Sequence, residues 1–161
     1  MLDEIGITEQ DSEGFRLRPD GETLEIIVTT RSSNPSLELL PAYFEDIGIK
    51  LIVNILERSL YEELTSAGDY DFAFSSVGNP ILPTDPRQYI GIDSQWAPLY
   101  GEWFDTGGES GIEPAEDHPI WDVWNAWEAA QTAPTLEEAL AAVQEMVSVH
   151  KENVWMIGTV G

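Results

Sequence analysis

The stretch PSLELLPAYFEDIGIKLIVNILE, residues 35–57, runs from a helical pattern straight into a strand pattern. In its first part apolar residues recur at helical spacing, and Gly48 is a natural helix stop. Asn34 is placed to cap this helix with Pro35 at its first position, while Pro41 should kink the helix or delay its start. The second part, KLIVNILE, reads as a strand. The expected buried stripe of the helix consists of Leu37, Leu40, Tyr43, Phe44 and Ile47.

Similar patterns continue on both sides of this stretch. LEIIVTT (24–30) predicts a strand buried on both faces, and Pro19-Asp20-Gly21-Glu22 before it predicts a hairpin turn. SLYEELTSAGD (59–69) predicts a short amphipathic helix, and DFAFSSV (71–77) a third strand. Crossovers this short require parallel strands, with helices covering the sheet. The sequence therefore predicts an α/β fold with a mostly parallel central sheet flanked by helices.

The third strand runs into a small, neutral, proline-rich loop, SSVGNPILPTDP. In open parallel sheets, ligands bind beyond the carboxyl ends of the strands. This loop is therefore interpreted as one wall of a ligand cleft. A pocket needs a few convergent polar groups, which the two serines, Asn79 and the backbone of Gly78 would supply. The candidate binding residues of this loop are Ser75, Ser76, Val77, Gly78 and Asn79.

The second half of the chain begins with a loop-rich region, 79–117, that is interrupted by aromatic residues. Trp96, Tyr100 and Trp103 in this region are candidates for stacking on a sugar or a peptide side chain, and packing inside the protein is an equal alternative. Two helices are predicted after it, at 117–131 and 134–152, and Thr135 with Glu138 predicts a capping box at the start of the second. The tail NVWMIGTVG has the composition of a strand. The expected core stripes are Trp121, Trp124 and Trp127 on the first helix, and Leu136, Leu140, Val143, Met146, Val147 and His150 on the second.

The composition excludes several classes of function. The net charge is −23, with thirty carboxylates and only seven basic side chains, so no basic surface for nucleic acid can be assembled. The same charge suits a solubility surface, including one adapted to high salt. There is no cysteine for a disulfide or a thiolate metal site.

No pattern for catalysis stands out. Glu102, Asp105 and Glu109 are acidic neighbours that a chain rich in carboxylates contains by chance, and Ser110 lacks a nucleophile-elbow pattern. His118 and His150 are isolated and are interpreted as structural residues. The sequence therefore predicts no enzyme activity, no cofactor and no metal.

Several segments together resemble a known family. LDEIGI and DSEGFRLRPDGETLEIIV, followed by AYFEDIGIKLIVNILERSLYEEL and GDYDFAFSSVGN, are similar to the C-terminal lobe of bacterial extracellular solute-binding proteins of the peptide/nickel class. HKENVWMIGTVG resembles the return strand of that lobe towards the hinge. The resemblance extends over essentially the whole chain and implies a periplasmic-binding-protein type II-like fold.

The resemblance also implies a role. Residues 1–161 would form a single domain, the C-terminal lobe of a two-lobed protein whose N-terminal lobe lies outside this chain. The intact protein would capture an oligopeptide or an oligosaccharide between its lobes and deliver it to the permease of an ABC transporter. It would be extracellular or periplasmic, with a lipid anchor left open. The alternative is an acidic protein-interaction module that binds no small molecule.

One departure from the family bears on the ligand. Peptide binders of the family place a tryptophan and an aspartate just after the third strand, and the aspartate pairs with the peptide's amino group. Here Val77 and Asn79 stand in that neighbourhood, and the next aspartate is Asp85. A hydroxyl-rich neutral ligand such as an oligosaccharide suits Asn79, the serines and the aromatic residues at least as well.

We expect the substitution Asn79→Asp, made in the intact protein, to alter ligand preference. A carboxylate facing the cleft would favour a ligand ammonium group through a charge-assisted hydrogen bond, which is roughly twice as strong as a neutral one. Calorimetric titration with peptides and with sugars measures the change. Unchanged affinities for both ligand classes would remove Asn79 from the site.

Overall fold

The computed structural model of the chain describes residues 2–75 and 86–158. The backbone forms two compact units. Unit 1 comprises Met1–Thr65 and Asp69–Ser75, and unit 2 comprises Ser66–Gly68 and Ser76–Gly161. Each unit contains its own cluster of buried apolar side chains. The expectation that residues 1–161 form a single domain stays a prediction.

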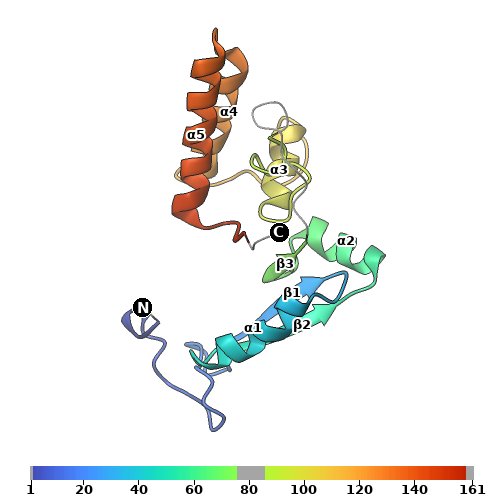
Figure 1. Ribbon diagram of the computed structural model, residues 1–161, viewed down its shortest axis with the longest axis vertical. Helices are drawn as coiled ribbons and strands as arrows, with labels where there is room; N and C mark the ends of the chain where they lie inside the picture. The colour runs from blue at the N-terminus through green and yellow to red at the C-terminus, as the bar shows by residue number, and fades with distance from the viewer. Residues whose placement is uncertain (1, 76–85, 159–161) are drawn as a thin grey trace. The chain divides into compact units, whose positions relative to one another are not determined.

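Unit 1 is an α/β fold built on a three-stranded parallel sheet, as predicted. β1 (Glu25–Thr30) lies between β2 (Lys50–Ile55) and β3 (Phe72–Phe74), and it pairs with both in parallel. The crossovers contain α1 (Pro35–Glu45) and α2 (Arg58–Ala67), which flank the sheet (Figure 1).

The start of α1 follows the predicted signals. The Asn34 side chain accepts a hydrogen bond from the Ser36 backbone N–H at 2.9 Å, and Pro35 takes the first helical position. Pro41 lies inside the helix, so the predicted delay of the start is wrong. The capped first turn and the packing of the apolar face outweigh the one backbone hydrogen bond that a proline cannot make. Gly48, with φ of 77°, follows the helix end as expected.

The core of unit 1 lies between α1 and one face of the sheet. Its fully buried members are Val28, Leu37 and Leu51, each of which contributes roughly 1.5–3 kcal/mol by burial. Leu40, Phe44, Val53 and Phe74 pack against them. The prediction that Tyr43 and Ile47 belong to the buried stripe of the helix was wrong, because both side chains are at least half exposed. Eleven helical residues present only a narrow stripe to a sheet of three strands.

The strand before α1 is buried at only one end. Val28, Thr29 and Thr30 are buried, whereas Glu25 and Ile27 are exposed. The prediction that it is buried on both faces therefore holds for its carboxyl half alone. Ile27 faces the same side as its register partner Ile52, opposite α1, and both keep more than a third of their surface exposed.

The predicted turn at residues 19–22 forms, but the strands beside it are short. The Arg18 N–H donates to the Glu22 carbonyl at 2.8 Å, and Leu17 and Thr23 form an antiparallel bridge. The chain then leaves this bridge and enters β1, where pairing in the parallel sheet replaces the hairpin. A 3₁₀ helix, η1 (Asp3–Ile5), precedes this region.

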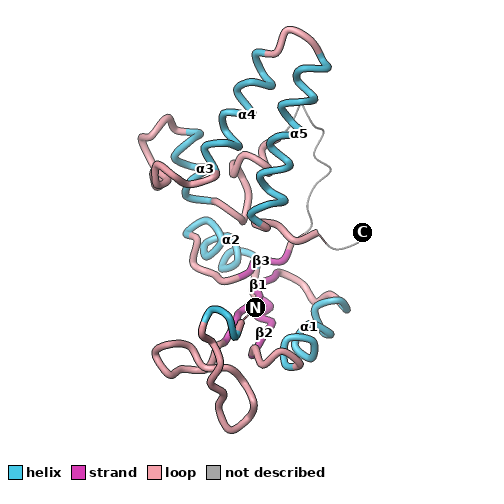
Figure 2. Tube along the Cα trace, turned by 90° about the vertical axis from the view of Figure 1, so that its left-hand side faces the viewer, coloured by secondary structure: helices cyan, strands magenta, loops and turns pink. Residues whose placement is uncertain are grey.

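Unit 2 is helical in its described part. α4 (Ile120–Thr132) and α5 (Leu136–Asn153) run side by side (Figures 1 and 2), and Thr135 caps α5 by accepting from the Glu138 N–H, as predicted. The predicted tryptophan stripe of α4 lies in the core, with Trp124 only 2% exposed. The core consists of Ile90, Ala97, Ile120, Val123, Trp124, Ala126, Ala130, Val143, Met146 and Val149.

The predicted stripe of α5 is half correct. Val143, Met146 and His150 are buried, but Leu136, Leu140 and Val147 are exposed. Val149 of α5 is part of the core instead. The face of α5 that packs against the core is therefore rotated from the face that carries Leu136, Leu140 and Val147. Residues 155–158 are not part of a strand, so the strand predicted for the tail is not formed by its described residues.

The loop-rich region contains a helix that the sequence did not predict, α3 (Pro98–Asp105). Its Gly101 is packed so closely against Gly91 that a Cβ atom there would overlap the Gly91 carbonyl. A glycine inside an eight-residue segment argues against a helix from sequence, yet here it is what allows the helix to pack. Among residues 2–75 and 86–158, no helix is long and apolar enough to cross a membrane.

We expect the free energy of unfolding to rise with NaCl concentration. The ion pairs of the described residues involve only a few carboxylates, such as those of Arg16 with Asp3 and Lys50 with Glu25, so most acidic groups repel one another. Screening shortens the Debye length from about 10 Å at 0.1 M to about 3 Å at 1 M salt. Urea unfolding followed by circular dichroism at both concentrations measures the effect.

A matched variant separates charge from general salt effects. Glu145 and Glu152 are exposed on α5, and replacing both with glutamine should raise stability at 0.1 M NaCl and reduce the gain at 1 M. An unfolding midpoint that stays constant or falls with salt would contradict charge repulsion as a major destabilising contribution.

Candidate functional site

The strand order of unit 1 creates a switch point at the carboxyl edge of the sheet. The crossover after β1 leads to β2 on one side of β1, whereas β3 pairs on the other side. In the order 2-1-3, the crevice for a ligand lies between the ends of strands 1 and 3. Thr30 and Phe74 form the last register pair of these strands, so Arg31 and Ser75 follow directly at this edge of the sheet. Ser75 is the first candidate binding residue of the predicted loop, and its role in binding stays a prediction.

Tyr61 of α2 supplies the buried polar group at this edge. Its side chain is 2% exposed, and its hydroxyl has no hydrogen-bond partner of normal geometry in the described part of the chain. Burial raises the pKa of Tyr61, while the neighbouring Ser75 hydroxyl and the Arg31 charge lower it. The Ser75 hydroxyl therefore lies close to the Tyr61 phenol. Burial also raises the pKa of the nearby Tyr70 to about 12, with Tyr61 adding to the effect.

Arg31 lies over the ring of Tyr61, with its guanidinium carbon 5.4 Å from the ring centroid. The sequence interpretation did not single out this arginine. The feature that could have identified Arg31 from the sequence is its position directly after a predicted parallel strand, in a chain with only seven basic residues. Of the other loop candidates, Ser76, Val77, Gly78 and Asn79 lie outside the described residues.

Two of the aromatic candidates line a pocket in unit 2. Trp96 and Tyr100 border a cavity of about 220 Å³ together with Gly68, Ala97, Pro98, Leu99 and Ile112. The lining is mainly apolar. Its volume is below the roughly 300–1,000 Å³ of typical ligand pockets, so its size suits a single ring or side chain of a ligand.

Trp103, the third aromatic candidate, packs within unit 2. Its ring stacks on Trp124 at a centroid distance of 5.9 Å and meets Trp121 edge to face at 5.5 Å. The structure therefore brings Trp96 and Tyr100 together at one pocket, places Trp103 in the aromatic packing, and places Ser75 in the other unit.

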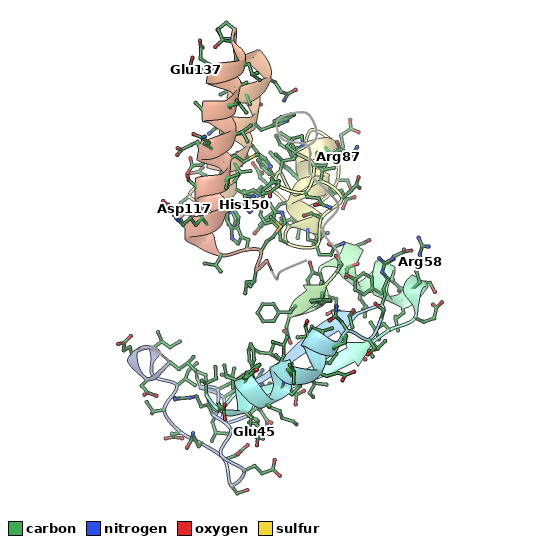
Figure 3. All side chains as sticks on the ribbon, in the orientation of Figure 1. Glu45, Arg58, Arg87, Asp117, Glu137 and His150 are labelled. Carbon is green, nitrogen blue, oxygen red and sulfur yellow. The ribbon has the colours of Figure 1, made fainter. Side chains whose placement is uncertain are left out.

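Both histidines take part in aromatic packing. His150 lies on α5 (Figure 3). It is 7% exposed, and its ring lies edge-on to Trp96, with a centroid distance of 4.7 Å, and to Trp155, with a centroid distance of 5.2 Å. Its Nε2 donates to the Tyr89 carbonyl at 2.6 Å, and its buried Nδ1 has no partner in the described residues. His118 stacks on Trp155 and accepts a hydrogen bond from the Ile120 N–H. These contacts agree with the structural roles that the sequence predicts.

A second cavity lies in unit 1, at the amino edge of the sheet. It has a volume of about 460 Å³ and is lined by Arg18, Glu22, Thr23, Glu25, Ile27, Lys50 and Asp71. Its groups are largely satisfied by one another, because Lys50 pairs with Glu25 at 2.9 Å and Asp71 accepts from the Ile27 N–H at 2.9 Å. The described residues contain no group of three potential metal ligands.

Comparison with solved structures relates this geometry to known proteins. The chain matches the oligopeptide-binding protein OppA with a TM-score of 0.84 and 26% sequence identity, over 99% of this chain and 28% of that protein. It matches MelB from Agrobacterium fabrum, solved with stachyose, with a TM-score of 0.73 and 16% identity over 98% of this chain and 24% of that one. The match to NikA from Brucella suis, solved with Fe(III)-EDTA, has a TM-score of 0.67, with 18% identity over 94% and 28% of the two chains.

These matches establish the fold and its extent. Nearly the whole chain corresponds to a part of solute-binding proteins of the peptide/nickel class, and it spans about 28% of the length of the OppA structure. The matched proteins are solute-binding proteins and not enzymes, in agreement with the expectation of no enzyme activity. No protein-family model and no curated protein matches the sequence.

We expect His150 to make unit 2 less stable as the pH falls below neutral. Burial lowers the pKa of His150 in the folded chain, so the unfolded chain binds the proton more readily. The stabilisation is complete above the ordinary pKa, about 6.5, and is lost as the pH falls towards the lowered value. Urea unfolding at pH 7.5 and pH 5.0, followed by tryptophan fluorescence, measures the loss.

The carboxylates also titrate, so the test compares variants. His150→Gln keeps a donor for the Tyr89 carbonyl but cannot be protonated, and wild type should lose more stability than this variant on acidification. Asn125→Gln, which changes an exposed residue of α4 that cannot be protonated, is the matched control and should behave like wild type. Equal pH dependence of wild type and His150→Gln would show that His150 does not destabilise the unit in acid.

Proposed function

We propose that this chain, which has the fold of a part of the peptide/nickel-class solute-binding proteins, belongs to a binding protein that captures an oligopeptide or an oligosaccharide for an ABC transporter. The match to the oligopeptide-binding protein OppA over 99% of the chain carries the proposal. The chain is the C-terminal lobe of that protein, and the N-terminal lobe and the transporter permease are its partners. The protein acts outside the cytoplasmic membrane, in the extracellular space or the periplasm.

The position of the switch point supports binding at the carboxyl edge of the sheet. Ser75 follows β3 there, and residues 76–79 continue the same segment. Our candidate contacts are therefore Ser75, Ser76, Val77, Gly78 and Asn79. Hydroxyl, amide and backbone groups of this kind bind neutral polar ligands through hydrogen bonds, without a charge of their own.

The pocket of unit 2 supports an aromatic contribution. Trp96 is held by a hydrogen bond from its Nε1 to the Gln88 carbonyl at 2.6 Å and by stacking on Trp155 at 4.7 Å. A ring fixed in this way presents a rigid surface at little entropic cost to binding. Tyr100 adds a second ring to the pocket, and Trp103 supports the aromatic packing behind it. Trp96, Tyr100 and Trp103 complete the proposed ligand-binding set.

The matched structures leave two ligand classes for this chain. OppA is an oligopeptide-binding protein, and MelB was solved with stachyose. The absence of an aspartate at the start of the loop removes the usual partner of a peptide ammonium group, whereas aromatic rings and neutral polar groups suit both classes. The proposal therefore includes both an oligopeptide and an oligosaccharide.

We expect the isolated chain to bind its ligand, but weakly, because one lobe supplies only part of the contacts. Trialanine, stachyose and mannohexaose serve as probes, titrated into isotopically labelled chain and followed by NMR. Tyr100→Ala should weaken binding about fivefold, since an aromatic contact contributes roughly 1 kcal/mol. Tyr43→Ala, which changes an exposed ring of α1, is the matched control and should leave binding unchanged.

The outcomes distinguish the proposal from its alternatives. Saturable shifts for one probe class support it and identify that class. The absence of shifts with every probe would favour the acidic interaction module over a binding-protein lobe. Hydrolysis of any probe would contradict a purely binding role.

A further inference from the structure

β2 forms one outer edge of the sheet in unit 1, because β1 pairs with it on one side and β3 lies beyond β1 (Figure 1). The Lys50 N–H donates to the Leu24 carbonyl at 3.0 Å, in the direction of β1. Backbone groups point to alternate sides along a strand, so those of Leu51, Val53 and Ile55 point away from β1. Among the described residues, these outward N–H and C=O groups have no backbone partner.

This edge lacks the features with which proteins protect a free strand. Exposed edges are usually short or carry a charge, a proline or a bulge, because an open row of backbone groups pairs readily with another chain. β2 pairs with β1 over six residues without a bulge, and residues 51–56, LIVNIL, contain no charge and no proline. The outer edge of β3 differs, since β3 has three residues and Asp71 directly precedes it.

The side chains of β2 complement a second copy of the same strand in antiparallel pairing. Leu51 belongs to the core between the sheet and α1, and Val53 packs against that core. Ile52 faces the other side of the sheet and is 37% exposed. When Ile52 lies opposite Ile52 of the second copy, Leu51 lies opposite Val53, and Lys50 lies opposite Asn54. Apolar residues then pair with apolar residues, and polar residues with polar residues.

The backbone fits the same register. Leu51 and Val53 point their N–H and C=O groups outward, so when they lie opposite each other they exchange both hydrogen bonds of an antiparallel pair. The two Ile52 residues form the pair without hydrogen bonds at the twofold axis, with Cα atoms about 4.5 Å apart. The neighbouring register also aligns the backbone, but it places Ile52 opposite Asn54. The side chains therefore select the first register.

The charge of the chain sets the conditions for this contact. Two copies with a net charge of −23 each repel one another, but the pairing of β2 places no carboxylate opposite a carboxylate. The repulsion therefore acts over longer distances, and it is screened when the Debye length falls from about 10 Å at 0.1 M salt to about 3 Å at 1 M. A single pair of short strands is smaller than a standard interface of roughly 1,200–2,000 Å², so the contact suits a weak, reversible dimer.

We propose that the chain forms a twofold dimer in salt-rich solution, by antiparallel pairing of β2 with β2 of a second copy and with Ile52 opposite Ile52. A twofold contact of this kind closes on itself and leaves no open edge at β2. The two sheets become one continuous sheet. The dimer does not depend on the proposed ligand binding, whose candidate residues follow β3 or lie in unit 2.

Single cysteines test the register, because the chain has no cysteine of its own. Ile52→Cys places two thiols across the axis, within the Cα separation of roughly 4.4–6.8 Å that a disulfide requires. Mild oxidation at 1 M NaCl should therefore link this variant into covalent dimers, measured by non-reducing gel electrophoresis. Val53→Cys and Asn54→Cys are the matched controls, since their thiols meet their own counterparts only in a shifted register. Both should link about tenfold more slowly.

Analytical ultracentrifugation measures the association without a crosslink. The association constant of the unmodified chain should rise about tenfold between 0.1 and 1 M NaCl. Ile52→Lys should weaken the dimer about tenfold, because two like charges then stand directly opposite in place of an apolar contact. Tyr43→Lys makes the same change of net charge at an exposed residue of α1 and should retain the dimer in full. Circular dichroism spectra ensure that the variants are folded.

Three results would overturn the proposal. A chain that stays monomeric at 1 M NaCl and millimolar concentration does not pair through β2, and the edge is then left for another polypeptide. Crosslinking of Val53→Cys or Asn54→Cys as fast as Ile52→Cys would exclude the proposed register. A dimer that Ile52→Lys retains in full would be formed by another surface. The proposed ligand binding is tested on other residues and is unaffected by each of these results.

Discussion

The pairing of β1 on both of its edges is the constraint on which unit 1 depends. A strand that is parallel to both of its neighbours cannot be joined to them by tight turns, so each crossover needs a helix. The order β2-β1-β3 follows when successive crossovers lead to opposite sides of the first strand. That order, and no single side chain, places the carboxyl ends of β1 and β3 side by side at Thr30 and Phe74. The strand order therefore determines where the polar and charged residues that follow β1 and β3 lie.

Unit 2 is held together by a different kind of interaction, the packing of large rings, several of which also form a hydrogen bond. The buried indole of Trp124 donates to the Ile90 carbonyl at 2.9 Å and stacks on Phe104 at 4.5 Å, so it joins α4 to α3 and to the loop before it. Trp96 and His150 join the same loop to α5. Because the Trp96 ring is fixed by a hydrogen bond as well as by stacking, it forms a well-defined wall of the pocket beside it.

Local signals in the sequence predicted most elements of the fold. The Asn34 and Thr135 caps, the stop near Gly48 and the turn at residues 19–22 depend on neighbours in the chain, and all four form. The misses depend on partners that are distant in sequence. α3 requires the close approach of Gly101 to Gly91, and the exposure of Leu136 and Leu140 depends on how far α5 is rotated against α4. Arg31 was missed for the same reason, since its importance comes from the strand order and from Tyr61.

The charge of the chain bears on its stability and on the solution that suits it. Thirty carboxylates repel one another over the Debye length, which is about 10 Å at 0.1 M salt. The ion pairs of the described residues offset little of this repulsion, because exposed pairs such as Arg18 with Asp20 and Arg58 with Glu62 contribute only about 0–1 kcal/mol each. Salt screens the repulsion between distant carboxylates and leaves the buried apolar clusters of both units intact. A chain of this composition therefore gains stability where ions are abundant, which is the physical basis of the high-salt interpretation of its sequence.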